Sequence, residues 1–189
     1  MTALPNRVGL IDYARSSFKS DWMDVFLCAS ARFMVATSSG LATISHAFGV
    51  PIAMTNYLPT ATTFLTSKDL FIPRLMRHLE SGLRLSFDEL MNPPFSLGVT
   101  DGMYSNVLRV EIIPNTEQEI ISLVSEMLDI VDCRICYGDE DNLLQERFKL
   151  TSEKWASMIN LSGYKVRCRA GRDFLRSHQD LLPELPLHH

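Results

Sequence analysis

The sequence has no long apolar run. Its longest apolar stretches, at residues 33–36 and 50–54, are only a few residues long, whereas a membrane-spanning helix needs about 20. Residues 1–17 also lack an apolar segment behind a basic end, which is the pattern of a secretory signal. We therefore expect no transmembrane segment and no export signal, and we expect a cytoplasmic protein.

Cysteine and positive charge are also scarce. Four cysteines in 189 residues are too few for a disulfide framework, and they suit a reducing compartment. The 18 Lys and Arg residues are outnumbered by 22 Asp and Glu residues, which gives a net charge of -4. Because no bulk positive field results, we expect no nucleic-acid partner, and an anionic ligand must be held by a local site.

What the chain does contain is ordinary globular composition, with 46% hydrophobic and 21% charged residues. Its 189 residues exceed the ~150-residue guide for one domain only slightly. We therefore expect a single domain over residues 1–189, in which residues 139–189 form a C-terminal helical extension. The extension is expected to pack on this domain or on a separate N-terminal domain.

Apolar and amphipathic segments alternate over the first sixty residues. Apolar runs at 8–11, 33–36 and 50–54 predict strands, and the stretches 21–29 and 41–48 predict helices. Runs without internal alternation are typical of strands covered on both faces, as in a parallel sheet with crossover helices. The expected fold is a Rossmann-like α/β domain, a doubly wound parallel sheet with additional C-terminal helices.

The regular alternation stops after Asn56. Residues 57–67 read as a Thr-rich loop near the surface, and a helix is predicted to begin at Asp69 with Pro73 in its first turns. The patterns Ser86-x-x-Glu89 and Thr116-x-x-Glu119 predict two further helix starts with capping boxes. The remaining predicted elements are a strand at 107–113 and helices at 120–131, 139–159 and 171–180.

The segment Thr37-Ser38-Ser39-Gly40 follows a predicted strand and opens a predicted helix. At such a corner, backbone N–H groups and hydroxyls converge at the positive end of a helix dipole, where an anion binds well. Gly40 would let the chain turn tightly or let a phosphate approach the backbone. Two interpretations are open from the pattern: a diphosphate-binding corner, or hydroxyls that only cap the helix.

The spacing beyond this corner separates two known architectures. Domains of the sugar-phosphate isomerase type follow a Ser-x-Ser-Gly loop with a long helix, but here residues 41–48 give a helix of only about 12 Å. The run ARFMVATSSGLATISHAFGVPIAMTN, residues 31–56, resembles the C-terminal, donor-binding half of GT-B glycosyltransferases. More narrowly, the chain resembles a bacterial family of glycosyltransferases assigned mostly by similarity. The resemblance extends over residues 20–24, 68–73, 85–90, 115–120 and 174–175.

The resemblance implies a nucleotide-sugar donor whose diphosphate lies near Ser38, Ser39 and Gly40. It implies transfer of the sugar to a glycan or lipid-linked acceptor of the cell envelope or of a polysaccharide, without a bound metal or other cofactor. GT-B enzymes also need an N-terminal acceptor domain, so the resemblance implies either such a domain or a partner chain that supplies it. It assigns no catalytic residue. The alternative is a non-catalytic module or truncated remnant that binds a sugar phosphate or a nucleotide in the same corner. A third possibility is a scaffold without a ligand, whose exposed helices assemble with a partner.

Four further residues are candidates for donor binding. Asp12 follows a predicted strand and could bond a ribose or sugar hydroxyl, or it could form a turn. Asn56 and Tyr57 end another predicted strand, where the amide could bond a hydroxyl and the ring could stack on a base. Lys68 could close over a phosphate, or it could be an ordinary surface lysine.

The pair Cys133-x-x-Cys136 raises the question of a zinc site. Zinc is usually held by four ligands with Cys or His at paired spacings. The other cysteines, Cys28 and Cys168, are isolated, and no two histidines have ligand spacing. We therefore expect no metal site in this chain.

Overall fold

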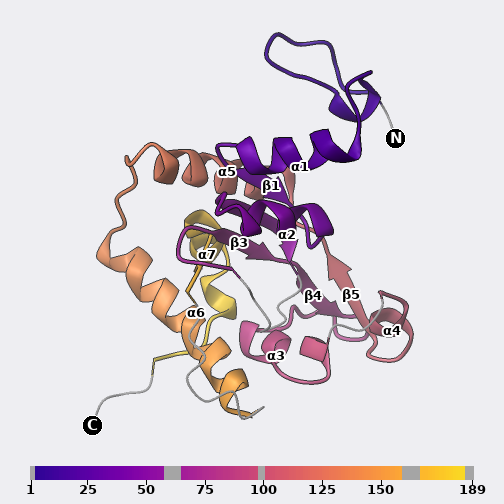
Figure 1. Cartoon of the computed structure of the whole chain (residues 1–189). Helices are drawn as coiled ribbons and strands as arrows, with labels where there is room; N and C mark the ends of the chain where they lie inside the picture. Colours follow the sequence, from indigo (N-terminus) through magenta and orange to yellow (C-terminus); the bar gives the residue numbers. More distant parts are fainter. Residues whose placement is uncertain (1–2, 58–64, 98–100, 159–166, 186–189) are drawn as a thin grey trace.

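The computed structural model of the chain describes residues 3–57, 65–97, 101–158 and 167–185 (Figure 1). Within these residues the fold is α/β, with a four-stranded parallel sheet flanked by helices and a two-stranded antiparallel sheet beside it. This architecture confirms the predicted Rossmann-like class.

The main sheet has the strand order β1-β2-β3-β6, and every neighbouring pair is parallel. On β2, Ile52, Ala53 and Met54 are completely buried. A strand covered on both faces needs an apolar residue at every position, which is why its sequence shows no alternation. The strands are β1 (Met34–Ala36), β2 (Ile52–Tyr57), β3 (Leu70–Pro73) and β6 (Arg169–Ala170).

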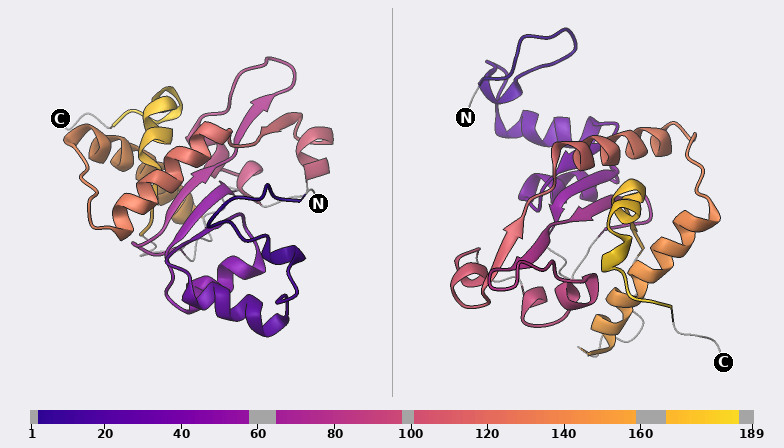
Figure 2. Two further views of the ribbon diagram at one scale, coloured as in Figure 1. Left: turned by 90° about the horizontal axis from the view of Figure 1, so that it is seen from above. Right: turned by 180° about the vertical axis from the view of Figure 1, so that it is seen from behind.

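Helices cover both faces of this sheet (Figure 2). Helix α2 connects β1 to β2 and lies with α1 on one face, whereas α5 packs against β2 and β3 on the other. Helix α6 reaches β3 through Phe148, whose ring lies 5.6 Å from that of Phe71. These helices are α1 (Asp21–Ser30), α2 (Gly40–Ala47), α5 (Glu117–Val131) and α6 (Asp139–Met158).

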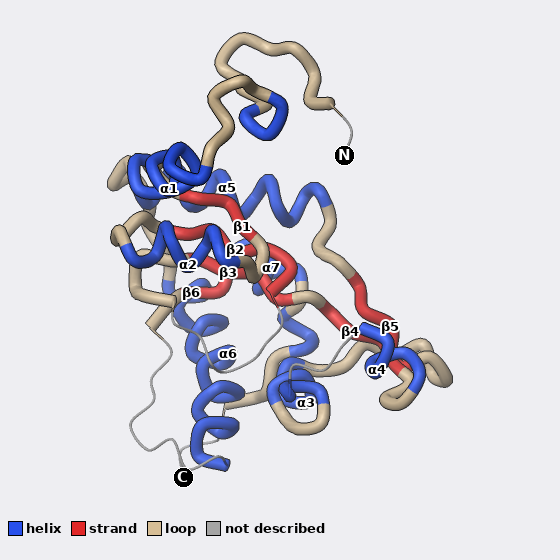
Figure 3. The backbone as a smooth tube through the Cα atoms, turned by 45° about the vertical axis from the view of Figure 1, so that its right-hand side comes forward, coloured by secondary structure: helices blue, strands red, loops and turns tan. Residues whose placement is uncertain are grey.

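A second, antiparallel pair of strands extends beyond the main sheet (Figure 3). Strand β4 (Leu75–His78) follows β3 after a single residue and pairs with β5 (Val110–Ile113). The predicted strand at 107–113 is thereby confirmed in its second half. The short helices are α3 (Phe87–Met91), α4 (Asp101–Asn106) and α7 (Arg172–Ser177), with 3₁₀ turns η1 (Tyr13–Arg15), η2 (Phe95–Leu97) and η3 (Gln179–Leu181).

Both predicted capping boxes are present. The Ser86 hydroxyl accepts from the backbone N–H of Glu89 at the start of α3, and the Glu89 carboxylate accepts in return from the Ser86 N–H. Thr116 and Glu119 make the same pair of bonds at the start of α5. These local patterns therefore fixed where two helices begin.

The predicted strand at residues 8–11 is wrong. These residues belong to an irregular loop that precedes α1 and projects away from the sheet (Figure 1). Val8 and Ile11 are exposed, Gly9 has a φ of +82°, and the Leu10 N–H bonds to the carbonyl of Arg7, three residues earlier. A left-handed residue inside the run turns the chain, so the run does not extend along a neighbouring strand.

The helix predicted to begin at Asp69 is also wrong, because this segment forms strand β3. All four of its residues are buried, between β2 on one side and β6 on the other. The apolar sequence of residues 70–73 suits a strand covered on both faces. Pro73 lies at the last position of this strand, and the next backbone N–H, that of Arg74, bonds to the carbonyl of Tyr57.

The C-terminal segment 139–189 contributes more than helices. Its strand β6 pairs with β3 and ends the main sheet on that side among the described strands. Helix α6 ends at Met158, and Ile159, the predicted end, lies outside the described residues. In the part of the chain that the structure describes, no helix is both long and apolar enough to span a bilayer.

Candidate functional site

The corner predicted from the sequence lies where β1 ends and α2 begins. Thr37, Ser38, Ser39 and Gly40 are all exposed. Ser39 is the N-cap residue of α2 and has an extended backbone, but its hydroxyl makes no capping bond. Its carbonyl accepts the Thr43 N–H at 3.4 Å, so the helix starts on backbone contacts alone. The hydroxyls of this corner are therefore not engaged in capping α2.

The amides of the corner form the positive end of α2. Among the described residues, no hydrogen bond engages the backbone N–H groups of Ser38, Ser39 or Gly40. N–H groups at a helix start have no partner inside the helix, and together with the dipole they attract an anion. The arrangement can hold a phosphate without any charged side chain.

Gly40 has no structural reason within the protein to be a glycine. Its φ does not fall in the left-handed region, and a Cβ added there would meet no atom within 4 Å. Glycine in a helix costs about 1 kcal/mol relative to alanine. The space above this residue is open, so a ligand can approach the backbone closely.

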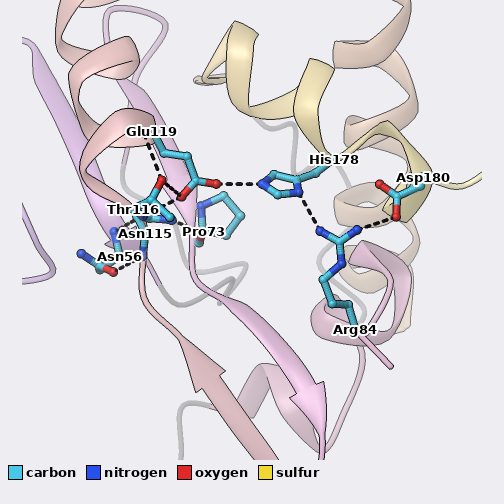
Figure 4. Close-up of polar contacts among 8 residues, drawn as sticks. All are labelled: Asn56, Pro73, Arg84, Asn115, Thr116, Glu119, His178 and Asp180. Atoms are coloured by element: carbon cyan, nitrogen blue, oxygen red, sulfur yellow. Dashed lines mark hydrogen bonds and ion pairs between the residues drawn. The ribbon is translucent and has the colours of Figure 1, made fainter. Parts of the chain in front are cut away.

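Asn56 lies at the same edge of the sheet but is occupied by the protein (Figure 4). Its backbone N–H donates to Oδ1 of Asn115 at 2.5 Å, and its own Oδ1 accepts the Asn115 N–H at 2.8 Å. Its carbonyl accepts Nε of Arg74 at 2.9 Å, and its φ is +50°. This reciprocal pair ties the end of β2 to the start of α5, so Asn56 has a structural role as a link between the two elements.

Tyr57 does not face a ligand either. Its ring is buried and packs edge-on against Phe71, with centroids 5.9 Å apart. A side chain inside the core cannot stack on a nucleobase. Tyr57 continues the buried run of β2, and this packing does not support the predicted stacking on a base.

Asp12 does not lie at the end of a strand as predicted, because no strand precedes it among the described residues. It lies in the loop before α1, where its Oδ2 accepts the Leu4 N–H at 3.2 Å and lies 3.8 Å from Nε of Arg15. These contacts close a local loop. The turn-forming interpretation of Asp12 is therefore the one that the structure supports.

Lys68 lies at the opposite edge of the sheet from the corner. The register aligns Leu70 with Ala53 and Val35, so Lys68 is level with residue 33. Thr37 lies four residues further along the strand direction, about 13 Å away. Lys68 and the corner therefore do not form one site.

Lys68 lines a separate small pocket of about 140 Å³ together with His46 and Thr66. The buried carboxylate of Asp69 organises this region. Its Oδ1 accepts the Ile52 N–H at 2.8 Å, and its Oδ2 accepts the Thr66 N–H and hydroxyl at 2.6 and 2.9 Å. Asp69 thus holds the connection into β3 against the start of β2.

A polar network that the sequence patterns do not predict lies next to Asn115 (Figure 4). Glu119 Oε1 lies 2.7 Å from Nε2 of His178, and Nδ1 of His178 lies 3.1 Å from Nη1 of Arg84. Arg84 donates onward to Asp180 at 2.8 Å. The network joins the start of α5 to the end of α7 and to the chain before α3. Only the Glu119 capping pattern pointed to it, because the other members are distant in sequence.

The environment of Glu119 favours its charged form. Desolvation by burial acts to raise the pKa of this carboxyl, but the hydrogen bonds from His178 and Thr116 outweigh it and hold the pKa below its ordinary value. All members of the network have partners. We interpret this network as a structural link that stabilises the carboxyl edge of the sheet.

The described residues contain no group of three or more His, Cys, Asp or Glu side chains that could hold a metal ion. Cys133 and Cys136 are both exposed free thiols after α5. The acidic residues at the start of α6 include Asp141, which is buried and paired with Arg176 at 2.7 Å.

Comparison of the chain with family models, with curated proteins and with solved structures found no match in any of the three.

Proposed function

We propose that the corner of Thr37, Ser38, Ser39 and Gly40 binds the diphosphate of a nucleotide sugar, and that the chain is the donor-binding domain of a glycosyltransferase. One observation carries the proposal: exposed amides and hydroxyls gather at the start of α2, beside a glycine that the protein's own packing does not require. The nature of the donor follows from the sequence resemblance of residues 31–56 and from the parallel sheet that presents the corner.

The corner suits the chemistry of glycosyl transfer. When the sugar leaves, negative charge develops on the departing nucleoside diphosphate. Preorganised N–H donors at the diphosphate stabilise that charge in the transition state more than in the bound donor, and this difference accelerates the reaction. Ser38, Ser39 and Gly40 would supply such donors without a metal ion.

The proposed donor site is smaller than the sequence predicted. We restrict it to the four corner residues, because Asp12, Asn56 and Tyr57 make contacts within the protein and Lys68 lines a separate pocket. The glycan or lipid-linked acceptor would be bound by an N-terminal acceptor domain or a partner chain. We expect the groups that bind the base and the sugar to lie around the carboxyl ends of β1 and β2, where open α/β sheets bind ligands.

A second candidate function is a non-catalytic module that binds a nucleotide or a sugar phosphate. Hydroxyls and amides hold a phosphate, but none of the four corner residues is a general acid or base. This composition favours binding without transfer. The two candidates share the corner and differ in whether a sugar is transferred.

Titration calorimetry with uridine, guanosine and cytidine diphosphates, and with a sugar phosphate, tests both candidates. We expect one nucleoside diphosphate to bind, and Gly40→Val to weaken it at least tenfold because a branched side chain fills the approach to the amides. Circular dichroism should show an unchanged fold, since no protein atom lies within 4 Å of the new Cβ. Gly138→Val, at the start of α6, is the matched control and should bind as the unchanged chain does.

The outcomes separate the candidates. Binding of the nucleotide sugar with transfer to an added glycan acceptor, or with slow hydrolysis of the sugar, supports the transferase. Binding without turnover, even when an acceptor domain is supplied, supports the module. If no phosphate compound binds, or if Gly40→Val binds normally, the site assignment is wrong.

A further inference from the structure

The outer edge of β1 is open. Among the described strands, β1 pairs with β2 alone. The Met34 N–H donates to the Pro51 carbonyl at the start of β2. Because successive residues of a strand turn their N–H and C=O groups to opposite edges, those of Val35 face away from β2. Native proteins often protect such an edge with Lys or Pro, but the strand reads Met-Val-Ala and Val35 is 44% exposed.

An apolar arm, residues 7–12, lies beyond this edge. The arm precedes α1 and projects away from the sheet on the side where β1 lies, opposite β6 (Figure 1 and Figure 3). Val8 is fully exposed, Ile11 is 78% exposed and Leu10 is 43% exposed. One side of the molecule therefore carries both an apolar segment without cover and a strand edge without a neighbour among the described residues.

We propose that two copies of this chain exchange their arms, so that each arm adds as a strand to the β1 edge of the other copy. Exchange of an identical segment between copies is a low-cost route to a dimer. A two-fold interface requires that each copy present both halves of the contact, and here the arm and the edge lie on the same side. The two arms then lie next to each other between the two β1 strands, in one continuous sheet.

The connection to α1 sets the direction of the arm. Helix α1 ends three residues before β1 begins, so the start of α1 lies toward the carboxyl end of β1. An arm that ends at the same level reaches α1 through residues 13–20, which span at most roughly 28 Å. It then runs parallel to its own β1. A two-fold axis perpendicular to the sheet makes it antiparallel to the partner's β1 and to the partner's arm, so that all these contacts are antiparallel.

The charges at the two ends agree with this direction. The arm begins with Arg7 and ends with Asp12. Arg32 precedes β1, and its side chain is 59% exposed although it pairs with Asp132. Antiparallel pairing brings Asp12 toward the partner's Arg32, whereas parallel pairing would bring Arg7 toward it. Like charges opposite each other destabilise a strand pair, so the antiparallel arrangement is favoured.

The single chain holds the arm away from its own β1. Gly9 has a φ of +82°, and the Leu10 N–H bonds to the Arg7 carbonyl, which folds the arm into a turn. Glycine adopts this conformation and an extended one about equally readily, so the arm can straighten when it pairs. The Tyr13 hydroxyl bonds to Asp24 at 2.6 Å and fixes the base of the arm beside α1. The position next to β1 is thereby left for the partner's arm.

Sedimentation velocity of the full chain from about 1 to 200 μM tests the proposal, because small interfaces dissociate in this range. We expect a concentration-dependent shift from 21.4 kDa to twice that mass. Ile11→Asp should raise the dissociation constant at least tenfold, because it places a charge within the added strand. Val107→Asp is the matched control, since Val107 is also a β-branched residue, 66% exposed, but follows α4; it should dimerise normally.

Val35→Pro tests the other half of the contact. It removes only the N–H that faces away from β2, so the pairing of β1 with β2 should remain, and circular dichroism should show an unchanged fold. The dimer should dissociate as in Ile11→Asp. An equimolar mixture of the two variants should associate more tightly than either alone, because the intact arm of the first meets the intact edge of the second.

Hydrogen–deuterium exchange with mass spectrometry identifies the segments that pair. Residues 7–12 and 33–37 should exchange more slowly at about 200 μM than at about 1 μM in the unchanged chain, and equally at both concentrations in Ile11→Asp. Four results would each overturn the proposal: a monomer at every concentration, a dimer that either variant leaves intact, a mixture no more associated than its components, or a dimer without protection of these two segments.

Discussion

At the scale of single residues, polar side chains near the carboxyl edge of the sheet are mostly engaged with one another. Asn115 is the centre of this arrangement. Its Oδ1 accepts the Asn56 N–H, and its Nδ2 donates to the Pro73 carbonyl at 2.8 Å. One side chain thus joins the ends of β2 and β3 to the start of α5 (Figure 4). Among the described residues near this edge, the amides at the start of α2 make no hydrogen bond within the protein, which is why the proposed function rests on them.

Asn115→Ala should destabilise the protein by about 2–3 kcal/mol, because it leaves the Asn56 N–H and the Pro73 carbonyl without their partner in a partly buried place. Urea unfolding followed by circular dichroism measures the change. Asn106→Ala, at the exposed end of α4, is the control and should stay within about 0.5 kcal/mol of the unchanged chain. Equal effects of the two variants would show that the link does not stabilise the fold.

The lowered pKa of Glu119 predicts that its contribution to the free energy of unfolding depends on pH. Its pKa in the folded protein lies below the ordinary value of 4.5, because hydrogen bonds from His178 and Thr116 outweigh desolvation. A depressed carboxyl pKa stabilises the fold above the unfolded-state pKa, and this contribution disappears as the pH falls through the folded-state pKa. Glu119→Gln should therefore cost about 1 kcal/mol at pH 7, allowing for partial exposure.

Unfolding titrations at several pH values check this sign. The stability difference between Glu119→Gln and the unchanged chain should shrink as the pH is lowered from about 6 to about 3. Glu117→Gln, exposed on the same first turn of α5, should show a much smaller difference throughout. A difference that grows on acidification would contradict the assignment.

At the scale of elements, the close approach of α7 to the sheet depends on one glycine. Gly171 follows β6 and is the N-cap residue of α7. A Cβ at this position would lie 2.9 Å from Cγ2 of Ile72 and 3.1 Å from Cδ1 of Leu123. The absence of a side chain therefore lets the corner between β6 and α7 pack directly on β3 and α5.

Gly171→Ala should destabilise the fold by about 1–3 kcal/mol, since Ile72 and Leu123 must shift to accept the methyl group. Its control is Gly138→Ala, at the corresponding position before α6, where a Cβ would lie 3.9 Å from Asp141 in ordinary contact. Both substitutions place alanine before a helix, so the difference between them measures packing. Thermal and urea unfolding should agree on that difference, and its absence would show that the corner has room to relax.

At the scale of the whole molecule, binding at the corner at the start of α2 can be measured through the stability of the fold. A nucleotide bound only by the folded state adds RT ln(1 + [L]/Kd) to the unfolding free energy. Ligand binding can therefore be measured through stability.

At a hundred times its dissociation constant, the bound nucleoside diphosphate should add about 2.7 kcal/mol and raise Tm by roughly 5–10 °C for a chain of this size. Differential scanning fluorimetry at a fixed protein concentration measures the shift. Gly40→Val should abolish the shift, whereas Gly138→Val should retain it. A shift that survives in Gly40→Val would place the nucleotide elsewhere on the protein.

The sequence by itself determined what depends on near neighbours in the chain. The capping boxes at Ser86 and Thr116, the buried run of β2 and the strand-to-helix corner at Gly40 were all predicted correctly, because hydrogen bonds and burial over a few residues decide them. The α/β class followed from the same local patterns taken in order.

The tertiary structure alone decided which side chains meet. Residues 8–11 and 70–73 have similar apolar character, but only the second run lies between two strands, so only it forms a strand. Lys68 and Gly40 fall at opposite edges because the register sets their places, and Asn56 is bonded to Asn115, 59 residues away. Such outcomes depend on contacts between distant segments, which a pattern read along the chain does not contain.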